Sequence, residues 1–227
     1  MTVSKKDVSA WDLEYAHLKW GGLAELSWIQ NRLADDSFLL DAGSGEGRYL
    51  RNFCFKFPCV GIDISKTALA RSMESISKSA GANKTFSNPN PDHIVSNISA
   101  LPFANESFDG VLCLGVLQHL FLKDREKAAA EFYRVLKNGG RVFFEAFGEE
   151  DMRCSGAPAV LNETNETEPR TFERQNGIIY HYFEESEIRD LFEKIGFKTI
   201  DLQSLKKEKR YNGENYIRHH YRAVFEK

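Results

Sequence analysis

The residues with the clearest chemical potential lie in the stretch "LLDAGSGEGRYL", residues 39–50. An apolar run ends at Asp41, and Gly43, Gly45 and Gly47 follow it. A glycine-rich turn between a first strand and a first helix is where an open α/β sheet binds its cofactor, because backbone N–H groups point at the ligand there. Turns of this kind usually hold phosphates, which the carboxylate of Asp41 would repel.

The spacing of this turn separates two classes of cofactor. A dinucleotide site is typically G-x-G-x-x-G, whereas this turn is G-x-G-x-G and places Arg48 at the third dinucleotide position. S-adenosylmethionine carries an ammonium, a sulfonium and a carboxylate, and it has no phosphate. The carboxylate of Asp41 would attract its cationic end. The turn therefore favours S-adenosylmethionine over a dinucleotide.

The surrounding chain alternates strand-like and helical runs. The helical runs are 46–57, 66–81 and 124–140, and Ser65 is the expected N-cap of the second. The strand-like runs are 37–43, 59–65, 93–99, 108–117 and 140–148. This order predicts βαβ units, and hence a mostly parallel sheet with helices on both faces. The glycine turn then lies at the carboxyl ends of the strands.

The chain after the fifth strand changes in character. Residues 149–177 are polar with little periodicity, and we expect a long insertion over the acceptor site. A helical run at 184–196 and strand-like runs at 197–207 and 216–227 follow. With no internal repeat and no second core, we expect one domain over 1–227.

Four motifs in order resemble those of the class I S-adenosylmethionine-dependent methyltransferases, most closely the type 11 group. They are "LLDAGSGEGRYL", "VGIDIS", "SNISALPFANESFDGVLCLGVLQHL" and "EFYRVLKNGGRVFF", and they cover residues 37–148. The resemblance implies a Rossmann-like seven-stranded sheet whose last strand is antiparallel. It also implies S-adenosylmethionine as the cofactor.

The resemblance assigns roles to residues at the glycine turn and the second strand. Asp41, Gly43, Ser44 and Gly45 match the turn that holds the methionine part of the cofactor. Asp63 matches the acidic residue that accepts both ribose hydroxyls, and a carboxylate suits that role because it can accept two donors at once.

Further matches concern the adenine and the ammonium. Ile64 matches a residue that packs on the adenine. Asn97 and Ile98 match the pair at the adenine edge, where many relatives have an aspartate first. The carbonyl oxygen of asparagine can still accept a bond from the adenine amino group. Leu114 matches a residue whose backbone carbonyl lies near the ammonium.

The N-terminal segment resembles the lid of small-molecule and tRNA-modifying relatives. Residues 1–36 are therefore an expected helical lid, and Tyr15 and Trp20 are its expected contacts with the cofactor. Packing of both rings in the core is the alternative.

Candidates for the acceptor site lie just after the fourth strand, within the insertion and just beyond it. His119 is placed to act as a general base near neutral pH, with a structural histidine as the alternative. Arg153 and Arg174 would clamp an acidic acceptor, and Tyr180 and His181 belong to an aromatic run beside them. For these four residues, a solvated loop or ordinary packing is the competing interpretation. The catalytic residues are left unassigned, and no metal-ligand spacing is present.

Charge and composition bear on partners and location. The net charge of −3 favours a small-molecule acceptor. A basic, tyrosine-containing run at 206–222 supports a second hypothesis, in which the protein is a tRNA methyltransferase similar to wobble-uridine side-chain enzymes. Such an enzyme would need a small activating protein. A third is a non-catalytic cofactor-binding subunit. No apolar stretch suits a membrane or a signal peptide, and the cysteines form no CxxC pair, so we expect a cytoplasmic protein.

Overall fold

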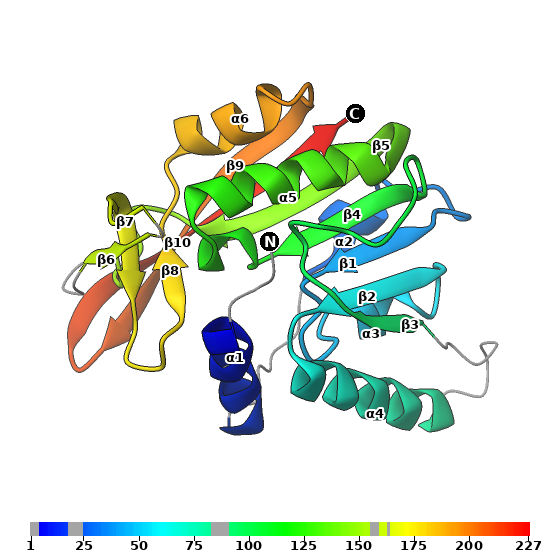
Figure 1. Ribbon diagram of the computed structural model, residues 1–227, viewed down its shortest axis with the longest axis horizontal. Coiled ribbons are helices and arrows are strands. Elements are labelled where there is room, and N and C mark those ends of the chain that lie inside the picture. Colours follow the sequence, from blue (N-terminus) through cyan, green and yellow to red (C-terminus); the bar gives the residue numbers. More distant parts are fainter. Residues whose placement is uncertain (1–4, 18–24, 83–90, 155–158, 163) are drawn as a thin grey trace.

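The computed structural model describes residues 5–17, 25–82, 91–154, 159–162 and 164–227. Its centre is a seven-stranded sheet in the order β3-β2-β1-β4-β5-β10-β9 (Figure 1). The strand β10 runs antiparallel to both of its neighbours, and the other pairs are parallel. The strands are β1 (Leu39–Ala42), β2 (Cys59–Asp63), β3 (Asp92–Val95), β4 (Phe108–Leu114), β5 (Leu136–Phe147), β9 (Lys198–Tyr211) and β10 (Glu214–Glu226). The predicted fold is confirmed.

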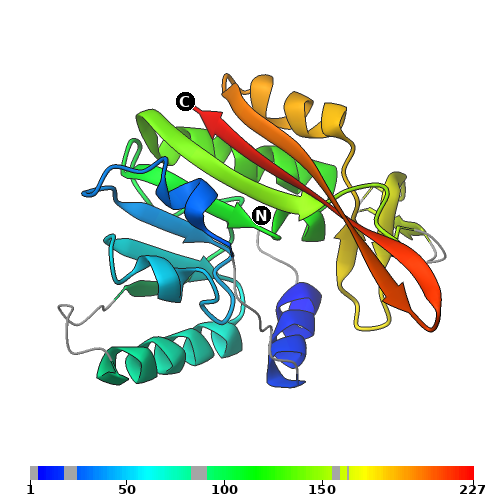
Figure 2. The same cartoon turned by 180° about the vertical axis from the view of Figure 1, so that it is seen from behind.

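Helices cover both faces of this sheet, as predicted (Figures 1 and 2). Side chains alternate along the strands: Val111 and Cys113 of β4 enter one core, whereas Leu112 and Leu114 enter the other. The first face carries α5 (Leu122–Val135) and α6 (Glu185–Glu193), and the second carries α2 (Ser27–Gln30), α3 (Leu50–Phe53) and α4 (Lys66–Ala82). Burial on both faces explains why the central strands are continuous apolar runs.

Two helices begin and end where local chemistry requires. The backbone N–H of Ala68 donates to Ser65 Oγ at 3.0 Å, which confirms Ser65 as the N-cap of α4. The helix expected over 46–57 is wrong in length, since α3 spans only 50–53. Gly47 has a φ of 76°, which no right-handed helix accommodates, and Pro58 lies a few residues beyond the other end.

The segment 149–177 is not the irregular loop that its polar sequence predicts. It contains β6 (Ala159–Leu161) and β7 (Thr167–Glu173), which form an antiparallel three-stranded sheet with β8 (Ile179–His181). The small sheet lies beside the far end of the β9–β10 hairpin (Figure 1). Its strands are short and largely polar, so hydrophobic periodicity gave no signal for them.

The helix α1 (Lys5–His17) lies between the small sheet and α4 in both views (Figures 1 and 2). Asp12 of α1 fixes this position, because its Oδ1 accepts bonds from Ser65 Oγ at 2.6 Å and from the N–H of Thr67 at 3.2 Å. At the last turn of α1, Arg71 donates to the carbonyl of Ala16 at 3.0 Å. Among the described helices, none combines the length and the apolar character that crossing a bilayer requires.

Candidate cofactor and acceptor site

The glycine turn joins the buried end of β1 to the second face of the sheet. Gly43, Gly45 and Gly47 have φ values of 82°, 53° and 76°. A Cβ on Gly43 would lie 2.6 Å from the Val116 side chain, and one on Gly45 would collide with the hydroxyl of Tyr15. The backbone conformation and the lack of space for a side chain therefore both require glycine at these positions. Because the turn carries no side chain there, a bound ligand can approach its backbone closely.

Asp63, the last residue of β2, is bonded to the same turn. Its Oδ2 accepts from the N–H of Gly45 and its Oδ1 from the N–H of Ser65, both at 2.9 Å. Only 8% of the residue is exposed, and burial raises the pKa of its carboxyl to about 6 although both N–H groups lower it. Each oxygen keeps a lone pair that can accept a hydroxyl from the cavity side.

Asp41 lies beneath the turn, between Gly61 of β2 and Leu112 of β4. It is 2% exposed, and burial raises the pKa of its carboxyl to about 7, against a backbone bond from Leu50 that lowers it. Its Oδ2 has no hydrogen-bond partner among the described residues. An uncompensated buried carboxylate oxygen suits a cationic neighbour, so the turn fits a ligand with a positive end.

We expect Asp41→Asn to raise the free energy of unfolding by about 1–2 kcal/mol at about pH 8. With a folded-state pKa of about 7, the folded state binds a proton that the unfolded state releases between about pH 4 and pH 7. Stability of the parent therefore falls as pH rises through this window, and asparagine removes that loss. Urea unfolding at both ends of the window measures it, with the exposed Asp35→Asn as control. An equal gain at both pH values would contradict the buried charge as its cause.

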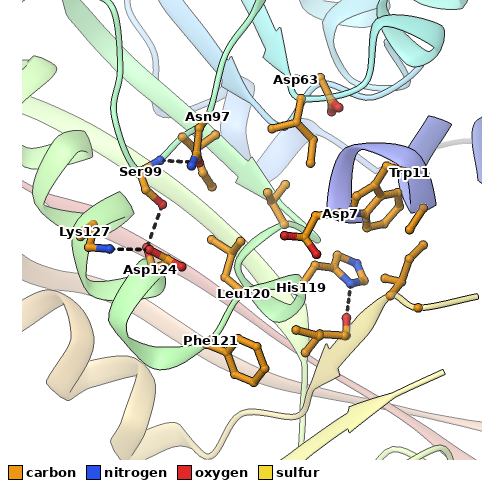
Figure 3. A pocket seen from close by; sticks show the side chains of 18 of the residues that line it. Asp7, Trp11, Asp63, Asn97, Ser99, His119, Leu120, Phe121, Asp124 and Lys127 are labelled. Atoms are coloured by element: carbon orange, nitrogen blue, oxygen red, sulfur yellow. Dashed lines mark hydrogen bonds and ion pairs between the residues drawn. The ribbon is translucent and has the colours of Figure 1, made fainter. Parts of the chain in front are cut away.

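A cavity of about 410 Å³ opens at the carboxyl ends of β1, β2 and β4. Figure 3 shows Asp63 and Asn97 toward one end of it and His119 and Phe121 toward the other. The predicted cofactor residues that line it are Tyr15, Gly43, Asp63, Ile64, Asn97 and Ile98. The predicted residues outside its lining are Asp41, Ser44, Gly45 and Leu114, whereas Trp20 falls outside the described residues. The turn and the cavity thus share one location.

Asn97 begins a tight loop after β3. Its Oδ1 accepts from the N–H of Ser99 at 3.0 Å, and Ser99 Oγ donates to the carbonyl of Asp124 at 3.2 Å (Figure 3). This Asx turn uses one lone pair of the amide oxygen and leaves the other. An asparagine here keeps an acceptor for an amino group while it also shapes the loop.

The helix α1 forms one wall of the cavity. Asp7, Trp11 and Tyr15 all line it, and their spacing of four residues places them on one side of the helix. Burial, with the charges of Asp63 and other carboxylates nearby, raises the pKa of Tyr15 far above its ordinary value, so it stays a neutral hydrogen-bond donor. The sequence reasoning missed Asp7, although the repeat of four from Tyr15 through Trp11 leads to it.

His119 lies in the short helix η1 (Leu117–His119) at the other end of the cavity. Its Nδ1 lies 2.7 Å from the carbonyl of Ile179, so the proton is assigned to Nδ1 (Figure 3). The N–H of Phe147 donates to Gln118 Oε1 at 3.0 Å, which turns the amide nitrogen toward His119 Nε2 at 3.3 Å. Burial lowers the pKa of His119 to about 4. The ring is neutral, and both nitrogens are in contact with the protein.

The ring of His119 is also packed between two aromatic rings. Trp11 and Tyr180 each lie 4.8 Å from it in edge-on geometry. The other predicted acceptor residues do not line the cavity. Tyr180 is buried behind His119, and the guanidinium of Arg174 stacks on its ring at 3.9 Å. These contacts resemble packing more than an acceptor clamp.

Arg153 and His181 lie further from the cavity. Arg153 bonds Asp151 at 2.7 Å and stacks on Phe147 at 4.1 Å. His181 is 2% exposed and lies 2.7 Å from Thr171 Oγ1, with Glu187 Oε1 2.9 Å from its Nε2. The structure therefore brings His119 to the cavity but places the two arginines and His181 in contacts of their own.

The fold and the site define a class of protein that binds a nucleoside cofactor at the carboxyl edge of a doubly wound sheet. The model of the type 11 methyltransferase domain matches residues 40–144. A Methanocaldococcus jannaschii protein, whose name gives no activity, is 30% identical over 84% of this chain and 68% of its own. The crystal structure of a Methanosarcina mazei S-adenosylmethionine-dependent methyltransferase is 25% identical, with a TM-score of 0.69, over 90% of this chain and 99% of that one. The chain belongs to the class I S-adenosylmethionine-dependent methyltransferases, and S-adenosylmethionine is its cofactor.

A shorter match concerns a possible acceptor. The Arabidopsis thaliana tRNA (carboxymethyluridine(34)-5-O)-methyltransferase is 31% identical over 52% of this chain, but the match covers only 26% of that protein. The aligned part has the length of the cofactor-binding half of this chain. The match therefore does not identify an acceptor.

Proposed function

We propose that this enzyme transfers the methyl group of S-adenosylmethionine to a small molecule bound at the His119 end of the cavity. Asp63 accepts the ribose hydroxyls, Asn97 and Ile98 hold the adenine edge, and Asp41 compensates the cationic end through the glycine turn. The cofactor supplies a methyl group on a sulfonium, which is already activated for displacement. The protein then contributes mainly position and exclusion of water.

The observation that carries this proposal is the closure of the cavity from two sides. Asp7, Trp11 and Tyr15 come from α1, and Leu161 and Ile179 come from the small sheet of β6–β8. At about 410 Å³ the cavity is near the lower end of the range for sites that hold one drug-sized ligand. A cofactor there leaves little space, so an acceptor held entirely inside the cavity must be small. We assign α1 as the lid and the segment 149–177 as part of the acceptor wall.

The direct test is to incubate the protein with cofactor labelled in the methyl group and a cell extract, and to fractionate the label. We expect counts in the small-molecule fraction. Counts in RNA or in protein would overturn the small acceptor. Calorimetry with S-adenosylmethionine and NAD, run alongside, tests the cofactor site itself: we expect binding of the first in the micromolar range and hardly any of the second.

A tRNA acceptor is the second candidate, and the β9–β10 hairpin favours it. Strand register pairs Lys207 with Arg218 and Lys209 with Tyr216, so these four residues share one face. The two exposed lysines suit a phosphate backbone, whereas Asp151 already binds Arg218 at 2.9 Å. The name of the Arabidopsis relative states that it acts on tRNA. An activating protein partner belongs to this second candidate.

The two candidates differ in their response to charge reversal on the hairpin. If the acceptor is small, we expect Lys207→Glu with Lys209→Glu to leave the transfer rate and its salt dependence unchanged, because the hairpin is not part of the cavity lining. Lys194→Glu with Lys198→Glu is the matched control, since both lysines are exposed and lie away from the hairpin tip. Loss of transfer in the hairpin variant alone, with a flatter salt dependence, would support tRNA.

A further inference from the structure

We infer that Gln118 is a positioning residue of the acceptor end: its side-chain amide fixes the ring of His119 in one tautomer and one orientation. The fixed ring then holds the lid helix α1 against the wall that η1 and β8 form. This inference rests on the proposed function, and it gives His119 a role other than that of a general base, which the sequence left open. The hydrogen bonds of the two side chains, the ring contacts and the surrounding charges support it.

The orientation of the Gln118 amide is set by the end of β5. Only 3% of Gln118 is exposed, and its Oε1 accepts from the backbone N–H of Phe147 at 3.0 Å. Since that N–H can only donate, the amide oxygen faces Phe147 and the amide nitrogen faces His119. Gln118 Nε2 lies 3.3 Å from His119 Nε2. An amide nitrogen only donates, so His119 Nε2 must accept and carries no proton.

The other nitrogen of the imidazole requires the same tautomer independently. His119 Nδ1 lies 2.7 Å from the backbone carbonyl of Ile179 in β8 (Figure 3). That carbonyl can only accept, so Nδ1 carries the proton. Both ring nitrogens thus have partners in the protein, and the two partners agree on the position of the proton. The lone pair that a general base would use is engaged by Gln118.

Aromatic contacts make the fixed ring a link between α1 and β8. Trp11 of α1 and Tyr180 of β8 each lie 4.8 Å from the imidazole, with interplanar angles of 78° and 88°. Edge-on contacts of this kind depend on the direction in which the ring points. A rotation of His119 would therefore disturb both contacts at once, and with them the closure of the cavity by α1.

The charged groups that act on His119 favour a neutral imidazole. The guanidinium of Arg174 stacks on Tyr180 at 3.9 Å, and that of Arg153 stacks on Phe147 at 4.1 Å. Each guanidinium thus lies against a residue that contacts His119 or Gln118, and both charges lower the pKa of the ring, after the larger effect of burial. The described carboxylates of the cavity lining all have interaction partners. They are Asp7, Asp63, Asp124 and Glu173.

A neutral and rigid ring suits the methyl transfer that we propose. The cofactor brings a positive sulfonium, and an imidazolium at the acceptor end would repel it. Methyl transfer also requires the acceptor to lie in line with the methyl group, and a wall that does not rotate keeps this alignment. An acceptor that must lose a proton therefore releases it to a group other than His119.

The first test determines the tautomer and does not depend on turnover. Nitrogen NMR of the full chain distinguishes protonated from unprotonated ring nitrogens, and the signals of His119 are those that disappear in His119→Asn. We expect a protonated Nδ1 and an unprotonated Nε2. We also expect no titration of this ring between about pH 5.5 and pH 8, because its pKa is about 4. A protonated Nε2, or titration within this range, would overturn the inference in the parent protein alone.

Replacing Gln118 by glutamate tests the amide itself. The carboxylate can still accept from Phe147, but it cannot donate to His119 and attracts a proton to Nε2 instead. We therefore expect the pKa of His119 to rise to about 6 or above. The exposed Gln203→Glu is the matched control and should leave the His119 signals unchanged. An unchanged pKa in a folded Gln118→Glu would show that the amide does not fix the ring.

The second test asks whether the fixed ring matters for transfer. With labelled cofactor and the small-molecule fraction of a cell extract, we expect Gln118→Glu to lower the transfer rate about tenfold. Its affinity for S-adenosylmethionine, measured by calorimetry, should stay that of the parent, which also shows that the variant is folded. In His119→Asn the amide nitrogen can replace Nδ1 as the donor to Ile179, and we expect a loss of no more than about tenfold.

Two results of this second test would contradict the inference. Unchanged transfer in Gln118→Glu would mean that the ring needs no positioning. A loss of about a hundredfold or more in His119→Asn, with a parent rate that falls as pH drops below about 7, would identify His119 as a general base. Label that enters only RNA or protein would overturn the small acceptor of the proposed function, whereas the NMR result would still decide whether Gln118 fixes the ring.

Discussion

Replacing Arg125 by methionine is expected to lower the free energy of unfolding by about 3 kcal/mol, because it removes the buried cation between two partly buried carboxylates, of which only Glu187 keeps a second described cation, Arg170. Arg125 lies in α5 with only 2% of its side chain exposed. Its Nη2 lies 3.1 Å from Glu168 and 3.3 Å from Glu187, and its Nη1 donates to the carbonyl of Leu120 at 2.6 Å. Urea unfolding monitored by circular dichroism measures the loss.

The position of this arginine explains why its loss should also affect the acceptor end. Leu120 and Phe121 line the cavity just before α5, and Glu168 belongs to β7 of the small sheet. Arg125 therefore joins the cavity wall to the segment that closes it. We expect the variant that still folds to bind S-adenosylmethionine normally but to turn over its acceptor poorly, since Asp63 and the glycine turn lie elsewhere.

A matched control separates the buried ion pair from ion pairs in general. Arg189 of α6 pairs with Glu185 at 2.9 Å, but 41% of its side chain is exposed. We expect Arg189→Met to cost about 0.5 kcal/mol or less. Adding Glu168→Gln and Glu187→Gln to Arg125→Met should restore part of the stability, because no uncompensated charge then remains. Equal effects of the two arginine variants would refute the buried network.

The cofactor half of the molecule could be predicted because its constraints are local. Gly43 and Gly45 are required by backbone conformation and close approach, and such positions appear in a sequence directly. The strands β1 and β2 are buried on both faces, so they read as continuous apolar runs. The start of α4 could be predicted from Ser65, because this N-cap involves only residues that are close to it in the chain.

The acceptor half could not be predicted in the same way because distant contacts decide it. Nothing near Arg125 in the chain indicates that it is buried, since its partners lie 43 and 62 residues away. Arg153 and Arg174 looked available for a ligand, but neighbouring rings and a carboxylate engage them. For His119 the position at the cavity was predictable, whereas its low pKa depends on burial and on those arginines.

Replacing Asp63 by alanine is expected to weaken S-adenosylmethionine binding by about 2–3 kcal/mol, or roughly 30- to 150-fold. The proposed function gives the reason, which is the loss of an ionised acceptor for the two ribose hydroxyls. Asp63 also accepts from Gly45 and Ser65, so circular dichroism must show that the variant is folded. Calorimetry measures the affinity, with Asp92→Ala, at the end of the edge strand β3 and outside the cavity lining, as control. An unchanged affinity in Asp63→Ala would mean that the ribose is held elsewhere.

The same carboxylate should make cofactor binding depend on pH. Because the pKa of Asp63 is about 6, the group that we propose to accept two hydroxyls at neutral pH becomes a protonated donor in mildly acidic solution. The contribution of Asp63 to the affinity is therefore expected to be constant above about pH 7 and to fall as pH drops through about 6, with proton release on binding in that window. Asp41 has a pKa of about 7 and titrates nearby, but it is retained in Asp63→Ala. The part of the pH dependence that disappears in this variant belongs to Asp63, and an identical profile in parent and variant would assign all of it to Asp41.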